Sequence, residues 1–345
     1  MPNLIIGLDI AKHVFQVHGV GEAGQVVFQR KLKRAEVLPF FSEQPAALVG
    51  IEACGTAHHW AREIGQLGHE VRLMPPAYVK PYIKRGKSDV ADAEAIAEAV
   101  SRPTMRFVAV KSAEQQAVLM LHRTRDLFIR QRTMLVNALR GHLAEFGATA
   151  AQGIYAASKL IEAAADACRS GLPDIARRCV ATLAASLDEL GQGIAAVDRQ
   201  IHEWHRNNET SRRLETIAGV GVITASALAA TVVDPHRFSS GRQLAAWIGL
   251  VPRQNGTGGK MQLGKISKQG DRYLRRLLVL GATALVRYTR NKPGALGQWI
   301  TALLGRRPTR LVTVAIANKL ARIAWAVIAR GEGYRHSGAA TAATA

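Results

Sequence analysis

The feature that most constrains the fold is the apolar run LIIGLDI at residues 4–10, because it carries an acid, Asp9, next to its last residue. Its β-rich apolar residues predict a buried strand, and Gly7 within it lets another part of the chain approach the backbone closely. A carboxylate at the end of such a strand, here Asp9, is costly unless a cation or hydrogen bonds offset its charge. The run therefore predicts either a cation site or an Asp that caps the next turn, and by itself it leaves both open.

The following segments continue a sheet. His13–Val20 and Gln25–Lys33 are predicted to be strands joined by a Gly-Glu-Ala-Gly turn, and Ala46–Glu52 is a second apolar run that contains a glycine and ends in an acid. A helical segment over Thr56–Gly68 and a short strand over His69–Met74 come next. This order predicts an α/β sheet with acids at strand ends, which is how ribonuclease-H-like nucleases begin.

Two more acids stand in the segment KSDVADA, where Ser88 or Asp89 is a plausible N-cap of an Ala-rich helix. Asp89 and Asp92 are three apart and share a face of the first turn, where acids are also common for helix-dipole reasons alone. Together with Asp9 and Glu52 they make four carboxylates, which is what a two-metal phosphodiester site requires. Oxygen donors of this kind select Mg²⁺ or Mn²⁺. Upstream basic residues that could hold a phosphate backbone are Lys80, Lys84, Arg85 and Lys87.

The middle of the chain is predicted to be helical. From Ser112 to about Phe146, pairs of apolar residues recur every seven positions and are surrounded by arginines. A second seam has a strict 3-4 spacing, which is typical of a coiled coil; it comprises Val180, Leu183, Leu187, Leu190, Ile194, Val197, Ile201 and Trp204. We predict a helical hairpin that packs on itself or on a second copy of the chain.

The net positive charge of the chain indicates what kind of molecule it binds. The chain of 345 residues carries a formal net charge of +20, and 18 Lys or Arg residues stand against a single acid, Asp271, between Arg237 and Arg330. An excess of this size indicates a polyanion such as nucleic acid. Residues 214–230, LETIAGVGVITASALAA, have the glycine turn of a helix-hairpin-helix module, whose amides at Gly219 and Gly221 would face a phosphate; a helix pair that merely packs is the alternative.

A glycine-rich loop in this basic segment carries the candidate nucleophile. The glycines that surround Thr257 are Gly256, Gly258 and Gly259. Two roles are open: the Thr257 hydroxyl attacks a phosphate, or the loop holds a phosphate without reacting with it. Spacing does not choose between these roles. The basic residues predicted to bind nucleic acid here are Arg253, Lys260, Lys265, Lys268, Arg272, Arg275 and Arg276.

Cysteine usage and hydropathy indicate a cytoplasmic protein without a membrane span. Cys54, Cys168 and Cys179 are an odd number with no CxxC pair, which fits a reducing compartment. The apolar N-terminal run lacks the preceding basic region of a signal peptide. The most lipid-like segment, Leu311–Ala329, is interrupted by Lys319 and Arg322 and is predicted to be a packed helix.

Taken together and in order, GLDIAK, GIEACGT, KSDVADA, AGVGVITA and GLVPRQN…GGK…ISKQGDRYLRR resemble the DEDD transposases of the insertion-sequence one-ten family, most closely its eleven-eleven branch. The resemblance covers nearly the whole chain. It implies an RNase-H/RuvC-like domain in which Asp9, Glu52, Asp89 and Asp92 bind Mg²⁺, and a C-terminal domain whose hydroxyl joins DNA covalently. It further implies a homodimer or homotetramer that acts on double-stranded donor and target DNA in the bacterial nucleoid, guided by a structured noncoding RNA.

The resemblance also implies domain boundaries and a role for Thr257. We expect a RuvC-like catalytic domain at 1–108, a helical or coiled-coil linker at 109–208, a mainly α transposase domain at 209–332 and a disordered tail at 333–345. At the position of the family's nucleophilic serine, this chain has Thr257, which is the first candidate for the nucleophile. Ser267 is the second candidate, and the third possibility is a catalytically impaired copy of the enzyme. The alternatives to a transposase are a RuvC-like structure-selective endonuclease without a covalent intermediate, and a non-catalytic nucleic-acid-binding protein whose acids are only caps.

Overall fold

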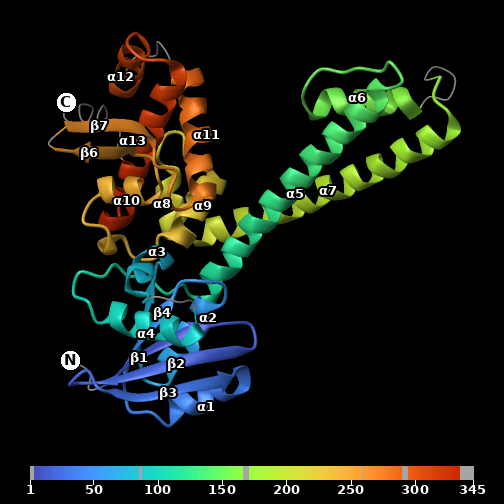
Figure 1. Cartoon of the computed structure of the whole chain (residues 1–345). Helices are drawn as coiled ribbons and strands as arrows, with labels where there is room; N and C mark the ends of the chain where they lie inside the picture. The colour runs from blue at the N-terminus through green and yellow to red at the C-terminus, as the bar shows by residue number, and fades with distance from the viewer. Residues whose placement is uncertain (1–3, 85–87, 166–170, 259, 290–293, 335–345) are drawn as a thin grey trace. The chain divides into compact units, whose positions relative to one another are not determined.

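The computed structural model describes residues 4–84, 88–165, 171–258, 260–289 and 294–334. They form two compact units (Figure 1). The first runs to Gln116 and also includes Thr231–Arg237; the second comprises Ala117–Ala230 and the residues from Phe238 onward. The expected boundaries at 108, 208 and 332 stay a prediction.

The first unit is built on a five-stranded sheet in the order β3-β2-β1-β4-β5. The strands are β1 (Leu4–Ile10), β2 (Val14–Gly21), β3 (Val26–Lys33), β4 (Leu48–Glu52) and β5 (Glu70–Met74). The pairs β1–β2 and β2–β3 are antiparallel, whereas β1–β4 and β4–β5 are parallel. The mixed α/β sheet predicted from the alternation of strands and helices is therefore confirmed.

The sheet has a core on each face because successive side chains of a strand point to opposite sides. From β1, Ile6 and Leu8 are buried with Trp60 and other apolar residues on one face, while Ile5 packs against a second cluster that contains Ile96. The helices of this unit are α1 (Val37–Ser42), α2 (Ala57–Gln66), α3 (Pro76–Val79) and α4 (Asp89–Val100), with single 3-10 turns at Arg34–Glu36 and Lys80–Tyr82.

Two paired glycines let α4 lie directly on the sheet. Gly7 of β1 is the register partner of Gly50 of β4. A Cβ at Gly7 would stand 2.1 Å from the Ala93 carbonyl oxygen, and one at Gly50 would stand 2.8 Å from Cβ of Val100. Both distances are too short for a side chain, so the close approach predicted at Gly7 is confirmed and its occupant is α4.

The second unit is mostly helical. Its helices are α5 (Ala113–Ala144, which begins in the first unit), α6 (Ile154–Ala165), α7 (Asp174–Asn207), α8 (Glu209–Glu215), α9 (Val222–Thr231), α10 (Gly241–Trp247), α11 (Arg272–Thr289), α12 (Ala295–Leu304) and α13 (Thr309–Arg330). The 3-10 turn at Pro235–Arg237 belongs to the segment Thr231–Arg237 of the first unit. The predicted glycine-rich loop is wrong as a loop: it forms an antiparallel hairpin of β6 (Pro252–Thr257) and β7 (Lys260–Ile266).

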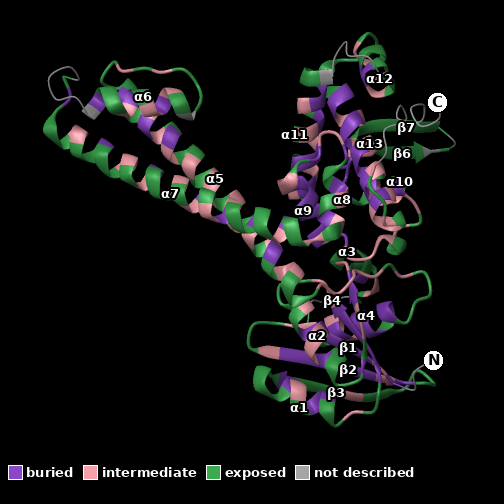
Figure 2. Cartoon of the chain, turned by 180° about the vertical axis from the view of Figure 1, so that it is seen from behind, coloured by how far each residue is buried: buried purple, intermediate pink, exposed green. Residues whose placement is uncertain are grey.

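In the 3-4 seam of α7, Val180, Leu187, Ile194, Val197 and Ile201 are buried. Figure 2 shows exposed, intermediate and buried residues interleaved along this helix, as expected when one face is covered. Val180 and Leu187 belong to one apolar cluster with Leu139 of α5 and Leu160 of α6, so this part of the seam packs within the chain. On α5, by contrast, three apolar residues seven apart are exposed: Met120, Leu127 and Met134. A coiled coil between two copies remains a prediction.

Helix α13 is the one described helix whose length and apolar composition would suit a membrane span. Val312, Ile316 and Leu320 are buried, and the helix packs against α10 and α11 in the second unit. Beyond its end, the backbone N–H of Tyr334 donates a hydrogen bond of 2.7 Å to the Thr216 hydroxyl. The rest of the predicted tail, residues 335–345, lies outside the described residues.

Candidate metal centre

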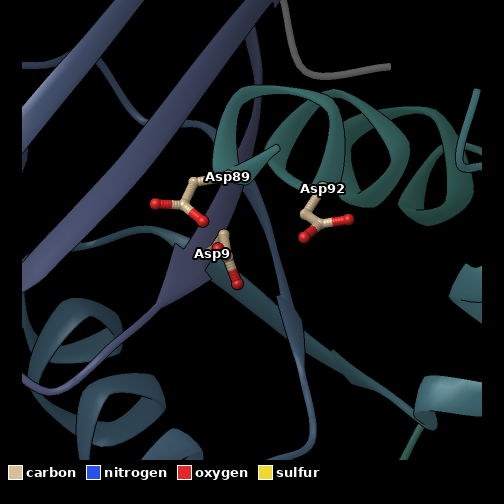
Figure 3. Close-up of side chains that lie close together, drawn as sticks. All are labelled: Asp9, Asp89 and Asp92. Carbon is tan, nitrogen blue, oxygen red and sulfur yellow. The ribbon is translucent and has the colours of Figure 1, made fainter. Parts of the chain in front are cut away.

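Three of the four predicted acids converge at the C-terminal end of β1, the central strand of the sheet (Figure 3). Asp9 is the next-to-last residue of β1, while Asp89 and Asp92 stand in the first turn of α4. Ser88 caps this helix by accepting a hydrogen bond of 3.2 Å from Ala91 N–H. One carboxylate oxygen from each acid lies within 4.8 Å of the others. The three carboxylates form the acid cluster, and oxygen donors at this spacing suit a divalent cation.

The fourth acid, Glu52, lies at the end of β4 and outside this group. The parallel register pairs Leu8 with Ile51, so the next residues along the two strands are Asp9 and Glu52. Partial burial, and then the charge of Asp92, raise the pKa of Glu52. Glu52 therefore lies within electrostatic reach of the cluster.

The acids repel one another when no cation is present. Burial, and then the charges of Asp92, Asp89 and Glu52, raise the pKa of Asp9 to about 6. A group that is partly desolvated beside three like charges has its ionised form disfavoured. A bound divalent cation would reverse this by offsetting the negative charge, so the donor set fits the metal that the sequence predicts.

A polar row, not predicted from the sequence, extends from the cluster across the sheet. Asp9 pairs with Gln16 on β2, and Gln16 pairs with Lys31 on β3. Side chains directly opposite in adjacent strands share a face. Gln16, Gln29 and Lys31 line a cleft of about 590 Å³ that Asp89 also borders. The sequence could have indicated this row through the pairing of the predicted strands, because aligning β2 with β1 and β3 places Gln16 and then Lys31 beside Asp9.

The basic segment upstream of α4 is only partly described. Lys84 Nζ forms an ion pair of 2.5 Å with Glu94 in the first unit. Arg85 and Lys87, both predicted to bind nucleic acid, lie outside the described residues. Their role remains a prediction.

The β6–β7 hairpin presents most of its predicted basic residues to solvent. Arg253, Lys260, Lys265 and Lys268 are exposed. Thr257 ends β6 and pairs with Lys260, and Gly258 has φ of 58°, as a tight turn requires. The side chain of Thr257 and all of Gly259 lie outside the described residues.

Other predicted residues have partners within the chain. Ser267 is buried, and Arg253 Nη2 donates a hydrogen bond of 3.3 Å to its carbonyl. Arg275 Nη1 donates to the carbonyls of Ile248 and Gln269, both at 2.7 Å. Arg276 pairs with Asp126, whereas Arg272 is exposed. Arg275 therefore supports the base of the hairpin, and the nucleic-acid role expected of it stays a prediction.

The predicted helix-hairpin-helix turn lies between α8 and α9. Gly219 has φ of 83°, and a Cβ there would stand 2.8 Å from the Leu285 side chain of α11. A Cβ at Gly281 would stand 2.0 Å from the Gly219 carbonyl oxygen, so the turn and α11 pack backbone to backbone. Gly221 faces open space. Close packing against α11 explains why residue 219 is a glycine. The contact of Gly221 with a phosphate stays a prediction.

Known proteins are similar to this chain over nearly its full length. A sequence profile described as "Transposase" matches residues 6–147, and one described as "Transposase IS116/IS110/IS902 family" matches residues 211–296. The "Probable family 20 transposase" of Pseudomonas aeruginosa is 51% identical over 331 residues, which are 96% of this chain and 98% of that protein. The "Transposase for insertion sequence element IS1111A" of Coxiella burnetii is 42% identical over 334 residues, 96% of this chain and 91% of the relative.

The α/β unit with its acid cluster and these similarities define an insertion-sequence transposase, an enzyme that acts on DNA. Within that class, the chain belongs to the IS116/IS110/IS902 family. The resemblance stated from the sequence is thereby confirmed.

Proposed function

We propose that this transposase cuts and rejoins double-stranded DNA by metal-assisted attack of a protein hydroxyl. The observation that carries the proposal is the acid cluster, in which Asp9, Asp89 and Asp92 place carboxylate oxygens within 4.8 Å of one another. Structural ion pairing does not account for three mutually repelling carboxylates, one near the end of β1 and two in the first turn of α4.

The acids of the cluster, joined by Glu52, would hold Mg²⁺ or Mn²⁺. When bound, the metal supplies Lewis acidity at the scissile phosphate and lowers the pKa of an attacking hydroxyl. Asp9 would bind as the carboxylate, and the raised pKa of its free form, about 6, means that metal binding displaces a proton at pH values around 6 and below. Lys31 and Gln16, which line the adjoining cleft, would hold the phosphate backbone of the strand that enters.

The hydroxyl is assigned to Thr257, at the end of β6. In the proposed step a bond forms between Thr257 Oγ1 and phosphorus as the bond from phosphorus to the departing deoxyribose oxygen breaks. The hydroxyl proton passes to water, and the departing oxygen takes a proton from water. Burial of Ser267 makes it the weaker candidate, since a nucleophile must reach the phosphate.

The remaining parts of the proposal concern partners. A structured noncoding RNA would guide the enzyme to donor and target DNA, as the sequence resemblance implies. The chain would act as a homodimer or homotetramer in the bacterial cytoplasm at the nucleoid, with a coiled coil of α5 and α7 as the linker and the turn at Gly221 on the DNA backbone. The charge of +20 supports a polyanionic partner.

Strand cleavage of a labelled duplex that carries the insertion-sequence boundary, with and without Mn²⁺, tests the proposal. Asp9→Asn removes one donor charge and should lower the cleavage rate by at least about a hundredfold. Glu22→Gln, an exposed acid in the turn after β2, is the matched control and should cut like the wild type. Cleavage that persists in EDTA, or an equal loss in both variants, would reject the metal centre.

A further inference from the structure

Helix α13 concentrates its mid-helix charges in one place. Between Leu311 and Ala329 only Lys319 and Arg322 are charged. Both line a cleft of about 670 Å³ between α10, α12 and α13, and Arg242 of α10 lines it as well. Among the described residues that line this cleft none is acidic. We call it the α13 cleft; its volume falls within the range of about 300–1,000 Å³ for small-ligand sites.

The α13 cleft also has aromatic walls. Trp299 of α12 and Trp325 of α13 line it, and Lys319 Nζ stands 4.2 Å from the centroid of the Trp299 ring. A cation at this distance from an indole ring is attracted by the ring face. Aromatic rings interleaved with Lys and Arg are the surface on which proteins bind unpaired nucleotides, with the base on the ring and the phosphate on the cation.

The floor of the α13 cleft is built by close backbone packing. A Cβ at Gly241 would stand 2.8 Å from the carbonyl oxygen of Arg322, so α10 and α13 touch where their basic residues meet. Asn318, on the same wall, donates a hydrogen bond of 3.2 Å to the Leu250 carbonyl. Leu250 lies two residues before β6, so the cleft is tied to the base of the hairpin that carries Thr257.

We propose that the α13 cleft binds one unstacked nucleotide of single-stranded RNA, with its phosphate on Arg322 and Arg242 and its base against Trp299. Bases of duplex DNA are stacked and paired, whereas RNA loops offer bases that are free to stack on aromatic and guanidinium planes. The Ser240 hydroxyl, which also lines the cleft, is a partner for a ribose 2′-hydroxyl. The choice of RNA as the ligand rests on the proposed function. The expectation that the cleft binds a nucleotide rests only on the aromatic and basic residues that line it.

Fluorescence anisotropy of a short labelled oligouridylate, titrated with the full chain in EDTA, tests the site without any cleavage. Trp299→Leu should weaken binding by about tenfold, since one base loses its stacking partner. Arg322→Gln should weaken it by about fivefold through loss of a charge-assisted phosphate contact. Because Arg322 is exposed, this second variant should fold normally even if Trp299→Leu does not.

Matched controls separate the site from general charge and general aromaticity. Arg310→Gln changes the same charge on the same helix outside the cleft. Trp247→Leu removes an exposed tryptophan that does not line the cleft. Both should change affinity less than about twofold. Equal losses at Arg310 and Arg322 would overturn the proposal. The matched deoxythymidylate and a DNA duplex should bind more weakly and respond less to Arg322→Gln, and equal responses would overturn the RNA assignment.

Failure here is distinguishable from failure of the proposed function. Asp9→Asn should bind the oligouridylate like the wild type, since the acid cluster and the α13 cleft belong to different units. Loss of metal-dependent cleavage with intact oligouridylate binding therefore rejects only the metal centre. A wild type that cuts DNA but does not bind the oligouridylate rejects only the cleft.

Discussion

At the scale of single residues, Gly7 decides where the acids meet. A Cβ there would stand 2.1 Å from the Ala93 carbonyl oxygen and 2.6 Å from Ala97 N, both in the backbone of α4. Gly7→Ala should therefore push α4 away from β1, separate Asp89 and Asp92 from Asp9, and lower the free energy of unfolding by about 1–3 kcal/mol. Calorimetric Mn²⁺ titration and thermal melting measure the two effects.

The matched control for that change is Gly65→Ala. Gly65 lies in α2, and nothing stands within 4 Å of a Cβ added there. It should leave Mn²⁺ binding unchanged and stabilise the fold by about 0.5–1 kcal/mol, as alanine does in a helix. Unchanged Mn²⁺ affinity in Gly7→Ala would show that α4 does not set the geometry of the acid cluster.

Thr257 is the residue at which the chain departs from the family pattern. If its hydroxyl attacks DNA, incubation with guide RNA, Mg²⁺ and labelled target DNA should give a protein–DNA adduct that survives denaturant. Thr257→Ser should match or exceed the wild-type yield, because it removes only a hindering methyl group. Thr257→Val keeps the shape and should lower the yield by at least about a hundredfold.

Binding is the control for the Thr257 series. Gly258 and Lys260 remain in the Val variant, so DNA and RNA affinity should change less than about twofold. An equal adduct in Thr257→Val would move the role to another hydroxyl, which peptide mapping would identify. An adduct that forms only in Thr257→Ser would show that this copy has lost its chemistry while its fold persists.

His122 makes the second unit sensitive to acid. It is 1% exposed on α5, its Nδ1 lies 3.0 Å from the Tyr273 hydroxyl and its Nε2 lies 3.1 Å from Ser226 Oγ. Burial, and then the charge of Arg125, lower the pKa of His122 to about 4. The unfolded chain takes up a proton near pH 6.5 that the folded chain refuses until about pH 4, so stability falls as pH drops through this window.

The predicted cost is about 2 kcal/mol at about pH 5 relative to neutral pH, from a shift of this size at 1.36 kcal/mol per pKa unit. Urea unfolding at neutral pH and at about pH 5 measures it. His122→Gln cannot take up the proton and should lose less stability on acidification than the wild type does. Parallel pH profiles for the two proteins would show that His122 does not set the acid sensitivity.

At the scale of elements, the sheet could be predicted and the hairpin could not. Apolar runs that end in Asp9 and Glu52 gave strands within a few residues of β1 and β4, because burial on both faces leaves a long apolar signal. Among the described residues, PRQNGT and KMQLGKI form a two-stranded sheet of their own and are largely exposed. PRQNGT has no apolar residue apart from its proline, and the short alternation in KMQLGKI is interrupted by Gly264, so the strand signal is weak. Their glycines were compatible with a loop.

The candidate site divides in the same way. The acids could be predicted because Asp9 and Glu52 stand at the ends of apolar runs and Asp89 and Asp92 stand in the first turn of a helix, and each of these positions leaves a local signal. The polar row through Gln16 and Lys31 depends on strand register, and the α13 cleft depends on α10 and α12 meeting α13. Contacts between distant elements have no such local signal. The internal pairing of Arg275 likewise appears only once its two carbonyl acceptors are placed.

Helices α5 and α7 give a prediction about the self-association of the chain. Leu187 is buried against α5 and α6, so Leu187→Lys should lower the free energy of unfolding by roughly 3 kcal/mol, through lost burial and a desolvated charge. Leu127 is 43% exposed in the stripe of α5 that also holds Met120 and Met134. If two copies meet through that stripe, Leu127→Lys should keep the melting temperature and weaken self-association by about tenfold.

Sedimentation velocity with parallel circular dichroism separates these outcomes. The exposed Arg130→Gln, which also lies on α5, is the control for a general change of charge and should affect neither measurement. An unchanged assembly in Leu127→Lys would reject the α5 stripe as the contact between copies. Normal melting of Leu187→Lys would contradict the packing of α7 within the chain.

At the scale of the whole molecule, positive charge is concentrated in the C-terminal part of the sequence, and this distribution predicts the salt dependence of DNA binding. The net charge is +20, and the segment from Arg237 to Arg330 has 18 basic residues and one acid. Affinity for a random-sequence duplex should fall by about a thousandfold between about 50 and 200 mM salt, as counterions released from six or more phosphates require. Filter binding at several salt concentrations gives the slope of log affinity against log salt.

The slope should be set by the second unit. Lys260→Gln with Lys265→Gln removes two exposed charges from the β6–β7 hairpin and should reduce the magnitude of the slope by about 2, because each charge neutralises about one phosphate. Lys12→Gln with Lys33→Gln removes two exposed charges from the first unit and should leave the slope within about 0.5 of the wild type. Equal reductions in both double variants would mean that the duplex is held by the net charge of the chain rather than by its C-terminal basic segment.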